Sequence, residues 1–166
     1  MTEIIDYYYS AVKLQGILKV AFGSLTAVIP ILLVMYYYKY RFYQGFMIAL
    51  VALGTHLLIS GRVSYEGADK MNSDMREYFQ TDANGFATEA TGMIEQNINH
   101  IQNHLIVFGV LLLAGIALVV LFRKGRSLVF GLGVGLVLMG LAGVIFDLVA
   151  ITDATRYLDA IQALME

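Results

Sequence analysis

Three histidines and a few carboxylates are the residues of this sequence whose types and spacing could do chemistry. His100 and His104 are one helical turn apart, so on a helix both could offer imidazole nitrogens to a metal ion or a proton. Glu66 or Asp147 could add a carboxylate oxygen to such a site. The HxxxH pattern alone is weak, because Ile101 follows His100 where the zinc-protease motif HExxH has its glutamate.

The simpler interpretation of these side chains is a layer of ion pairs and hydrogen bonds, and the sequence favours it. On the predicted third helix, His104 flanks the buried row of side chains and His100 faces further away, so the two do not clearly converge on one point. A bound divalent metal is therefore an alternative, and the absence of any cofactor is the leading expectation.

His56 lies within an apolar stretch of hydrocarbon length, where ionisable residues are functional candidates. A haem held by two histidines would need a second histidine at the same depth. Antiparallel register puts the level of His56 near Val110, about six residues from His104, which is about 9 Å of helical rise. Haem is therefore only a second alternative. Because His56 also lies off the buried row that contains Gly54 and Leu57, we expect it to face lipid or another protein.

Motifs of other known chemistries are missing from the sequence. It contains no cysteine, which excludes disulfides, thiol nucleophiles and thiolate metal sites. It contains no GxSxG, no phosphate-binding loop, no dinucleotide-binding glycine motif and no ExxH pair for a di-iron bundle. Whether the protein is an enzyme stays uncertain, and a non-enzymatic role is favoured.

The elements that must position the candidate residues are four apolar segments of 17 to 19 residues, at 20–38, 45–61, 105–122 and 128–146. A helix needs about 20 residues to cross a bilayer. Only 14% of the residues are charged, against about 25% in soluble proteins. The sequence therefore predicts four transmembrane helices.

Each predicted helix continues beyond its apolar segment. Between Ala87 and Leu112, residues that alternate four and three positions apart form the row that a helix buries against other helices, and a similar row runs from Leu50 to Tyr78. Four helices of about 36 to 39 residues, joined by short turns such as 81–85, predict an all-α, up-down-up-down four-helix bundle of one domain, 1–166. About half of each helix would stand outside the membrane, in the extensions 1–19, 62–104 and 147–166.

The distribution of charge predicts an orientation. The turns 38–44 and 123–127 contain five of the eleven Lys and Arg residues and none of the thirteen Asp and Glu residues, so both are expected in the cytoplasm. Both chain ends are then extracytoplasmic, on an acidic face that disfavours nucleic acid as a partner. A prokaryotic cytoplasmic membrane is the expected location, with lipids as obligatory neighbours.

Tyrosines interleaved with cations follow the first apolar segment. Phenol rings at the headgroup level with charges beyond them are typical of an interfacial anchor. The expected anchor residues are Tyr36, Tyr37, Tyr38, Lys39, Tyr40 and Arg41. The only proline, Pro30, is expected to kink this helix.

Glycines predict close helix packing in the fourth segment. Gly131 and Gly135 form a GxxxG pattern, and Gly140 and Gly143 follow it. Such glycines serve contacts within one bundle or contacts with another chain, and the sequence does not separate the two.

Antiparallel register brings six ionisable residues to one level, at the outer membrane boundary: Lys19, Arg62, Glu66, His100, His104 and Asp147. The leading hypothesis is nevertheless a non-enzymatic membrane subunit or accessory protein that works through contacts with other membrane chains or with itself. It depends on the missing catalytic motifs, the glycine face and the expected outward position of His56. The alternatives are an extracytoplasmic ligand- or metal-binding bundle and a haem- or metal-containing membrane redox protein.

Overall fold

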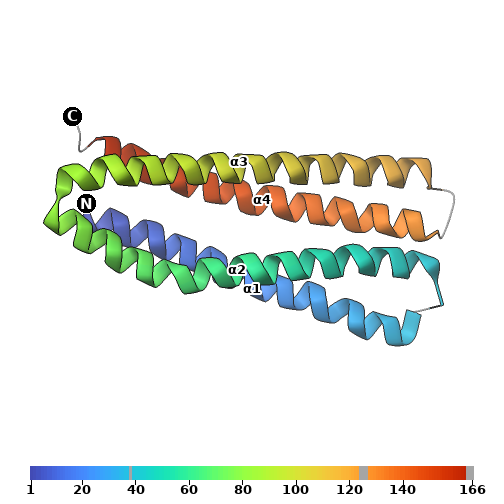
Figure 1. The fold of residues 1–166 in the computed structure, drawn as a ribbon. Helices are drawn as coiled ribbons and strands as arrows, with labels where there is room; N and C mark the ends of the chain where they lie inside the picture. The colour runs from blue at the N-terminus through green and yellow to red at the C-terminus, as the bar shows by residue number, and fades with distance from the viewer. Residues whose placement is uncertain (38, 124–126, 164–166) are drawn as a thin grey trace.

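Four long helices make up the described part of the chain. The computed structural model describes residues 1–37, 39–123 and 127–163, apart from the side chains of residues 34, 35 and 84. Helix α1 spans Thr2–Tyr37, α2 spans Arg41–Thr81, α3 spans Ala83–Leu121 and α4 spans Leu128–Gln162. Consecutive helices are antiparallel, so the start of α1 and the end of α4 lie at the same end of the molecule as the α2–α3 connection (Figure 1).

The four helices have lengths close to the predicted 36 to 39 residues. They contain 36, 41, 39 and 35 residues, and each is long and apolar enough to cross a membrane. The prediction of an all-helical fold with four helices of membrane-spanning length is confirmed. Helix α1 stays one continuous helix through Pro30, whose ring is buried.

The connection between α2 and α3 is shorter than the predicted turn at 81–85. Helix α2 ends at Thr81 and α3 begins at Ala83, so Asp82 alone joins them. The Asp82 carboxylate accepts a hydrogen bond of 2.9 Å from the backbone N–H of Gly85, which satisfies one of the free donors of the first turn of α3. The Asn-Gly pair that suggested a turn is therefore part of a helix, because the aspartate before it supplies the cap.

Glycines bring α2 and α4 together near the α1–α2 and α3–α4 connections. A Cβ atom at Gly45 would meet the backbone carbonyl of Leu128, and one at Gly131 would meet that of Phe42. Further along, Gly135 lies against the methyl group of Ala49. Close backbone approach of this kind requires residues without a side chain.

Glycines also mediate the contacts within each hairpin. Gly61 packs against Gly16 and Gly54 against Gly23 between α1 and α2, and Gly133 packs against Gly115 between α3 and α4. Gly140 and Gly143 lie against Leu112 and Phe108 of α3. We call residues 20–61 and 105–146 the glycine half of the bundle, and the rest of the described chain the terminal half. All four glycines of the predicted packing face are thus buried within this chain.

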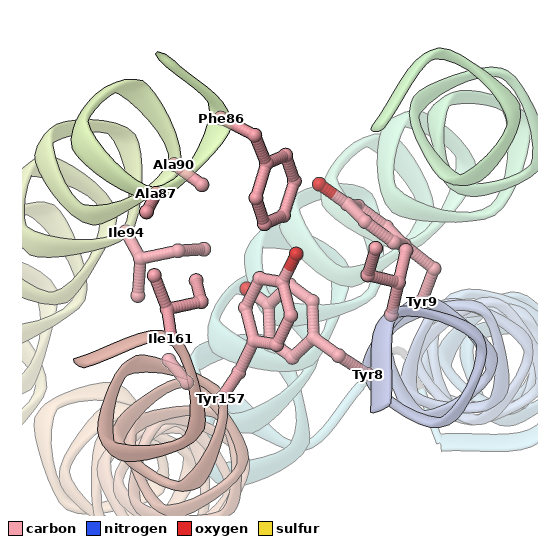
Figure 2. Close-up of a cluster of buried hydrophobic side chains, with 10 residues drawn as sticks. Tyr8, Tyr9, Phe86, Ala87, Ala90, Ile94, Tyr157 and Ile161 are labelled. Carbon is pink, nitrogen blue, oxygen red and sulfur yellow. The ribbon is translucent and has the colours of Figure 1, made fainter. Parts of the chain in front are cut away.

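Large side chains fill the free end of the terminal half. Figure 2 shows this cluster, in which the phenol rings of Tyr8 and Tyr157 stack with centroids 4.4 Å apart and planes 5° from parallel. Phe86 lies near the start of α3, and the centroid of its ring is 5.3 Å from that of Phe79, near the end of α2. We call this cluster the terminal core; its members are Ile5, Tyr8, Tyr9, Phe86, Ala87, Ala90, Ile94, Ala154, Tyr157 and Ile161.

The expected anchor tyrosines lie at the opposite end from the terminal core. Tyr36 and Tyr40 are exposed, and the ring of Tyr37 lies 4.8 Å from that of Tyr43. Lys39 and Arg41 are exposed as well. Tyr38 lies outside the described residues, as do Lys124 and Arg126 of the basic turn.

Candidate functional site

Two adjoining cavities occupy the terminal half and its junction with the glycine half. The tyrosine chamber, of about 680 Å³, is lined by Tyr8, Tyr9 and Tyr157 together with side chains of α2 and α3. The histidine chamber, of about 370 Å³, is lined by His56, His100 and His104 and by residues of all four helices. The two chambers share six lining residues: Tyr8, Val12, Val63, Ser64, Asn97 and His100. They therefore form two parts of one space, which is partly open to solvent because exposed residues such as Val63 and His100 line it.

The three histidines come together at the histidine chamber. The ring centroids of His100 and His104 are 4.4 Å apart, and those of His104 and His56 are 6.4 Å apart. The expectation that His56 faces lipid is wrong, because its half-buried ring lines the chamber and contacts Phe108 at 5.5 Å. The expectation that His56 lies too far from His104 to share a site is wrong as well.

Two features of α2 explain the position of His56. A second row of inward-facing residues (Ala49, Leu53, His56 and Ser60) runs beside the row that contains Gly54 and Leu57. The second row exists because α2 packs against both α1 and α4. In addition, the one-residue connection at Asp82 shifts the register, so that the level of His56 is near Phe108 rather than Val110.

Asp147 is the buried charged residue of the histidine chamber. Its exposed fraction is 6%, and its Oδ2 atom is buried without a hydrogen-bond partner. Lys19 lines the same chamber, but its ammonium lies over the ring of Phe146, 6.0 Å from the centroid, and makes no ion pair with Asp147 in the described structure. A buried carboxylate oxygen without a donor costs free energy, so this position calls for a partner.

Glu66 does not belong to the chamber. Its carboxylate is exposed and pairs with Arg62 of the same helix at 2.7 Å. Neither residue lines a chamber, although the register places both near the level of His100. The predicted layer of six ionisable residues is therefore divided between a surface pair and a group that lines the chamber. That group contains Lys19, the three histidines and Asp147, of which His100 is exposed.

Polar contacts that the sequence did not single out hold the chamber walls. Gln15 of α1 donates a hydrogen bond of 2.8 Å to Asp153 of α4, and Asn97 of α3 donates one of 3.3 Å to the Tyr8 hydroxyl. Gln15 stands on the otherwise apolar stripe of α1, and a polar residue in such a stripe is the signal that could have identified it.

The phenols of the tyrosine chamber are strongly desolvated. Burial raises the pKa values of Tyr8, Tyr9 and Tyr157 above the ordinary value of 10.0. The Tyr157 hydroxyl is buried without a hydrogen-bond partner, and Figure 2 shows it pointing from α4 into the space between the helices. The internal space thus contains two unpartnered polar groups, the Asp147 carboxylate and the Tyr157 hydroxyl.

The described residues include no group of three His, Asp or Glu side chains arranged to hold a metal ion. His100 and His104 are close enough for two ligands, but Glu66 is turned away and cannot supply a third. The arrangement suits binding of a polar group more directly than metal coordination.

Comparison with protein-family models, with curated proteins and with solved structures gives no significant match to this chain.

Proposed function

We propose that the protein is an integral membrane protein that binds a small ligand in its two chambers, on the extracytoplasmic side of the membrane. The observation that carries the proposal is the pair of adjoining cavities of about 680 Å³ and about 370 Å³, the smaller of which is lined by the buried Asp147 with its unpartnered Oδ2 atom. Ligand cavities typically have volumes of about 300 to 1,000 Å³, with mostly apolar walls and a few polar groups.

Membrane placement is supported by the outward faces of the helices. Apolar side chains such as Leu25 and Leu32 of α1 and Val110 and Leu113 of α3 are more than half exposed on the isolated chain. Faces of this kind are stable when they meet lipid tails. We propose that the segments 20–38, 45–61, 105–122 and 128–146 span a prokaryotic cytoplasmic membrane, with the basic turns inside and the tyrosines at the inner interface.

A role through contacts with partner proteins has less support than the sequence suggested. Two of the observations that suggested this role were a glycine face on α4 that could meet another chain and the expected outward position of His56. Gly131 and Gly135 instead pack against α2, Gly140 and Gly143 against α3, and His56 lines the histidine chamber. These residues are engaged within the chain, so they provide no free surface for a partner.

The proposal is tested by native mass spectrometry of the full chain extracted gently from its membrane. We expect a small-molecule adduct on the wild-type protein. A haem adduct would be recognised by its mass and visible absorbance, and it would support the redox alternative. Partner chains with no small adduct would support the subunit alternative.

Two glycines provide a matched pair of variants for this experiment. A Cβ atom at Gly67 or at Gly92 would enter open space, but only Gly67 lines a chamber. We expect Gly67→Phe to lose the adduct, because the added ring occupies the tyrosine chamber, and Gly92→Phe to retain it. Equal retention by both variants, or a wild-type protein without any adduct, would contradict the proposal.

A further inference from the structure

We infer that the ligand is an amphipathic organic cation, a protonated amine on an apolar or aromatic body, whose N–H groups bind Asp147. This inference rests on the proposed ligand-binding function and specifies the class of ligand. Three observations support it: the donor that Asp147 lacks, the charge of the histidine chamber and the character of the tyrosine chamber.

The missing partner of Asp147 is a hydrogen-bond donor. An ionised carboxylate only accepts hydrogen bonds, and its Oδ2 atom receives none in the described structure. Lys19 lies over Phe146 and Gln15 donates to Asp153. His100 and His104 lie within electrostatic reach of Asp147 but donate no hydrogen bond to its Oδ2 atom in the described structure. A ligand ammonium would supply both the N–H donors and the opposite charge that a buried carboxylate requires.

The charged side chains of the histidine chamber leave a negative excess. Helix α4 contributes Asp147 and Asp153, α1 contributes Lys19, and α2 and α3 contribute the three histidines. When both carboxylates are ionised and the three imidazoles are neutral, two carboxylates face one ammonium. One further positive charge would balance the chamber, whereas an anion would add to the imbalance.

The tyrosine chamber suits the apolar part of such a ligand. Its walls include Tyr8, Tyr9 and Tyr157 and three methionines, Met71, Met75 and Met93. Aromatic faces attract cations and apolar rings, and methionine adapts its shape to varied apolar groups. Tyr157 follows Asp147 by ten residues on α4, about 15 Å along the helix, so its free hydroxyl is placed for a second polar atom of a longer ligand.

A route into the space lies between α2 and α3. These two helices make few contacts with each other. Gly67 and Met71 of α2 and Met93 and Gln96 of α3 all line the tyrosine chamber, and Met71 and Met93 are partly exposed. A flexible methionine pair at the edge would let a ligand pass without separating the terminal core.

The test uses three probes with one apolar body: 4-phenylbutylamine, the neutral 4-phenylbutanol and the anionic 4-phenylbutyrate. Their dissociation constants are measured by calorimetry on the full chain in lipid nanodiscs, with empty nanodiscs subtracted. We expect the amine to bind at least about tenfold more tightly than the alcohol, because only the amine pairs with a desolvated carboxylate.

Variants of α4 connect this preference to Asp147. We expect Asp147→Asn, which keeps the shape and removes the charge, to abolish the tenfold advantage of the amine. Asp147→Glu should retain part of it, which guards against a general effect of substitution at this position. Asp159→Asn provides the matched control, since Asp159 is an exposed carboxylate on the same helix and should have no effect.

The outcomes separate the inference from the proposed function. If the alcohol or the anion binds as tightly as the amine, and Gly67→Phe abolishes that binding, the cation inference is overturned and the ligand-binding function stands. An amine preference that persists in Asp147→Asn also overturns the inference. If no probe binds and the extracted protein carries no adduct, both proposals fail.

Discussion

The glycine half and the terminal half of this bundle use the same four helices but pack them in opposite ways. In the glycine half, residues without side chains bring backbones together, as at Gly45 and Gly131 between α2 and α4. In the terminal half, the rings of Tyr8, Tyr157 and Phe86 fill the space between the helices. The histidine chamber lies at the junction of the two halves, and the tyrosine chamber lies in the terminal half, beside rings of the terminal core.

This difference shows that the size of the interface residues sets the distance between neighbouring helices, and that this distance changes along their length. Where glycine faces the neighbouring helix, the interaxial distance can fall below the usual 8 to 10 Å, which leaves less room between the helices. Where tyrosine and phenylalanine face inward, they act as spacers. The glycines thus set the short distance between helices in one half, and the rings of the terminal core set the longer distance in the other.

The largest expected effect comes from forcing the glycine half apart. Gly131→Leu would drive a side chain into the backbone of Phe42, so we expect a loss of about 5 kcal/mol or failure to fold. The free energy of unfolding is measured in detergent micelles by circular dichroism. Gly109→Leu is the control, because a Cβ atom there meets nothing within 4 Å. Equal effects at both positions would show that close approach of α2 and α4 does not hold this half together.

Emptying the terminal core should have the next largest effect. Phe86 is fully buried, so Phe86→Ala should cost about 3 to 5 kcal/mol of unfolding free energy through lost apolar contact and the cavity left behind. Tyr7→Ala removes a ring of similar size that is 58% exposed, and it should cost less than about 1 kcal/mol. A small effect of Phe86→Ala would mean that the rings follow the helix spacing rather than set it.

The desolvated tyrosines make the terminal half sensitive to high pH. Above the ordinary tyrosine pKa of 10.0, the unfolded chain loses protons that Tyr9 and Tyr157 keep in the folded state, because burial raises their pKa values. Their contribution to stability is therefore complete below pH 10 and is lost as the pH rises above it, by up to about 1.4 kcal/mol per pH unit for each tyrosine.

This pH dependence is measured as the unfolding midpoint between about pH 9 and pH 11.5. Tyr9→Phe removes one of the three buried phenol groups and should make the decline shallower. Tyr7→Phe, which changes an exposed phenol, should leave the slope as it is. Identical slopes in the wild-type protein, Tyr9→Phe and Tyr7→Phe would contradict the inference that the Tyr9 phenol is desolvated in the folded state.

The sequence predicted most of the fold because helix burial repeats at fixed intervals. In the row from Ala87 to Leu112 on α3, Ala87, Ile94 and Phe108 are buried and the other members are half-buried. The helix ends are also close to prediction, apart from the turn at 81–85. That turn was missed because Asn-Gly is a strong turn signal, whereas the capping strength of Asp82 depends on geometry that only the folded chain provides.

The site was predicted less well, for two physical reasons. His56 was assigned to the outer face because one buried row per helix was assumed, whereas α2 has two neighbours and buries two rows. The chamber itself was missed because a cavity depends on how the distances between helices change along the bundle. The residue pattern of one helix does not give those distances. His100, His104 and Asp147 were correctly placed at one level, since antiparallel register follows directly from helix lengths and short connections.

The smallest expected effect comes from the ion pairs on the surface of the terminal half. Arg76 of α2 and Asp6 of α1 approach to 3.2 Å, and both side chains are more than two-fifths exposed. A double-mutant cycle of Arg76→Gln and Asp6→Asn should give a coupling energy of about 0.5 kcal/mol at low salt, and less at high salt because solvent ions screen exposed charges. Arg62→Gln, which breaks a pair within α2 alone, should not couple to Asp6→Asn. A coupling above about 2 kcal/mol would mean that charge pairing between α1 and α2 rivals the buried rings in holding the terminal half, and the contrast between glycine spacing and ring spacing would then be incomplete.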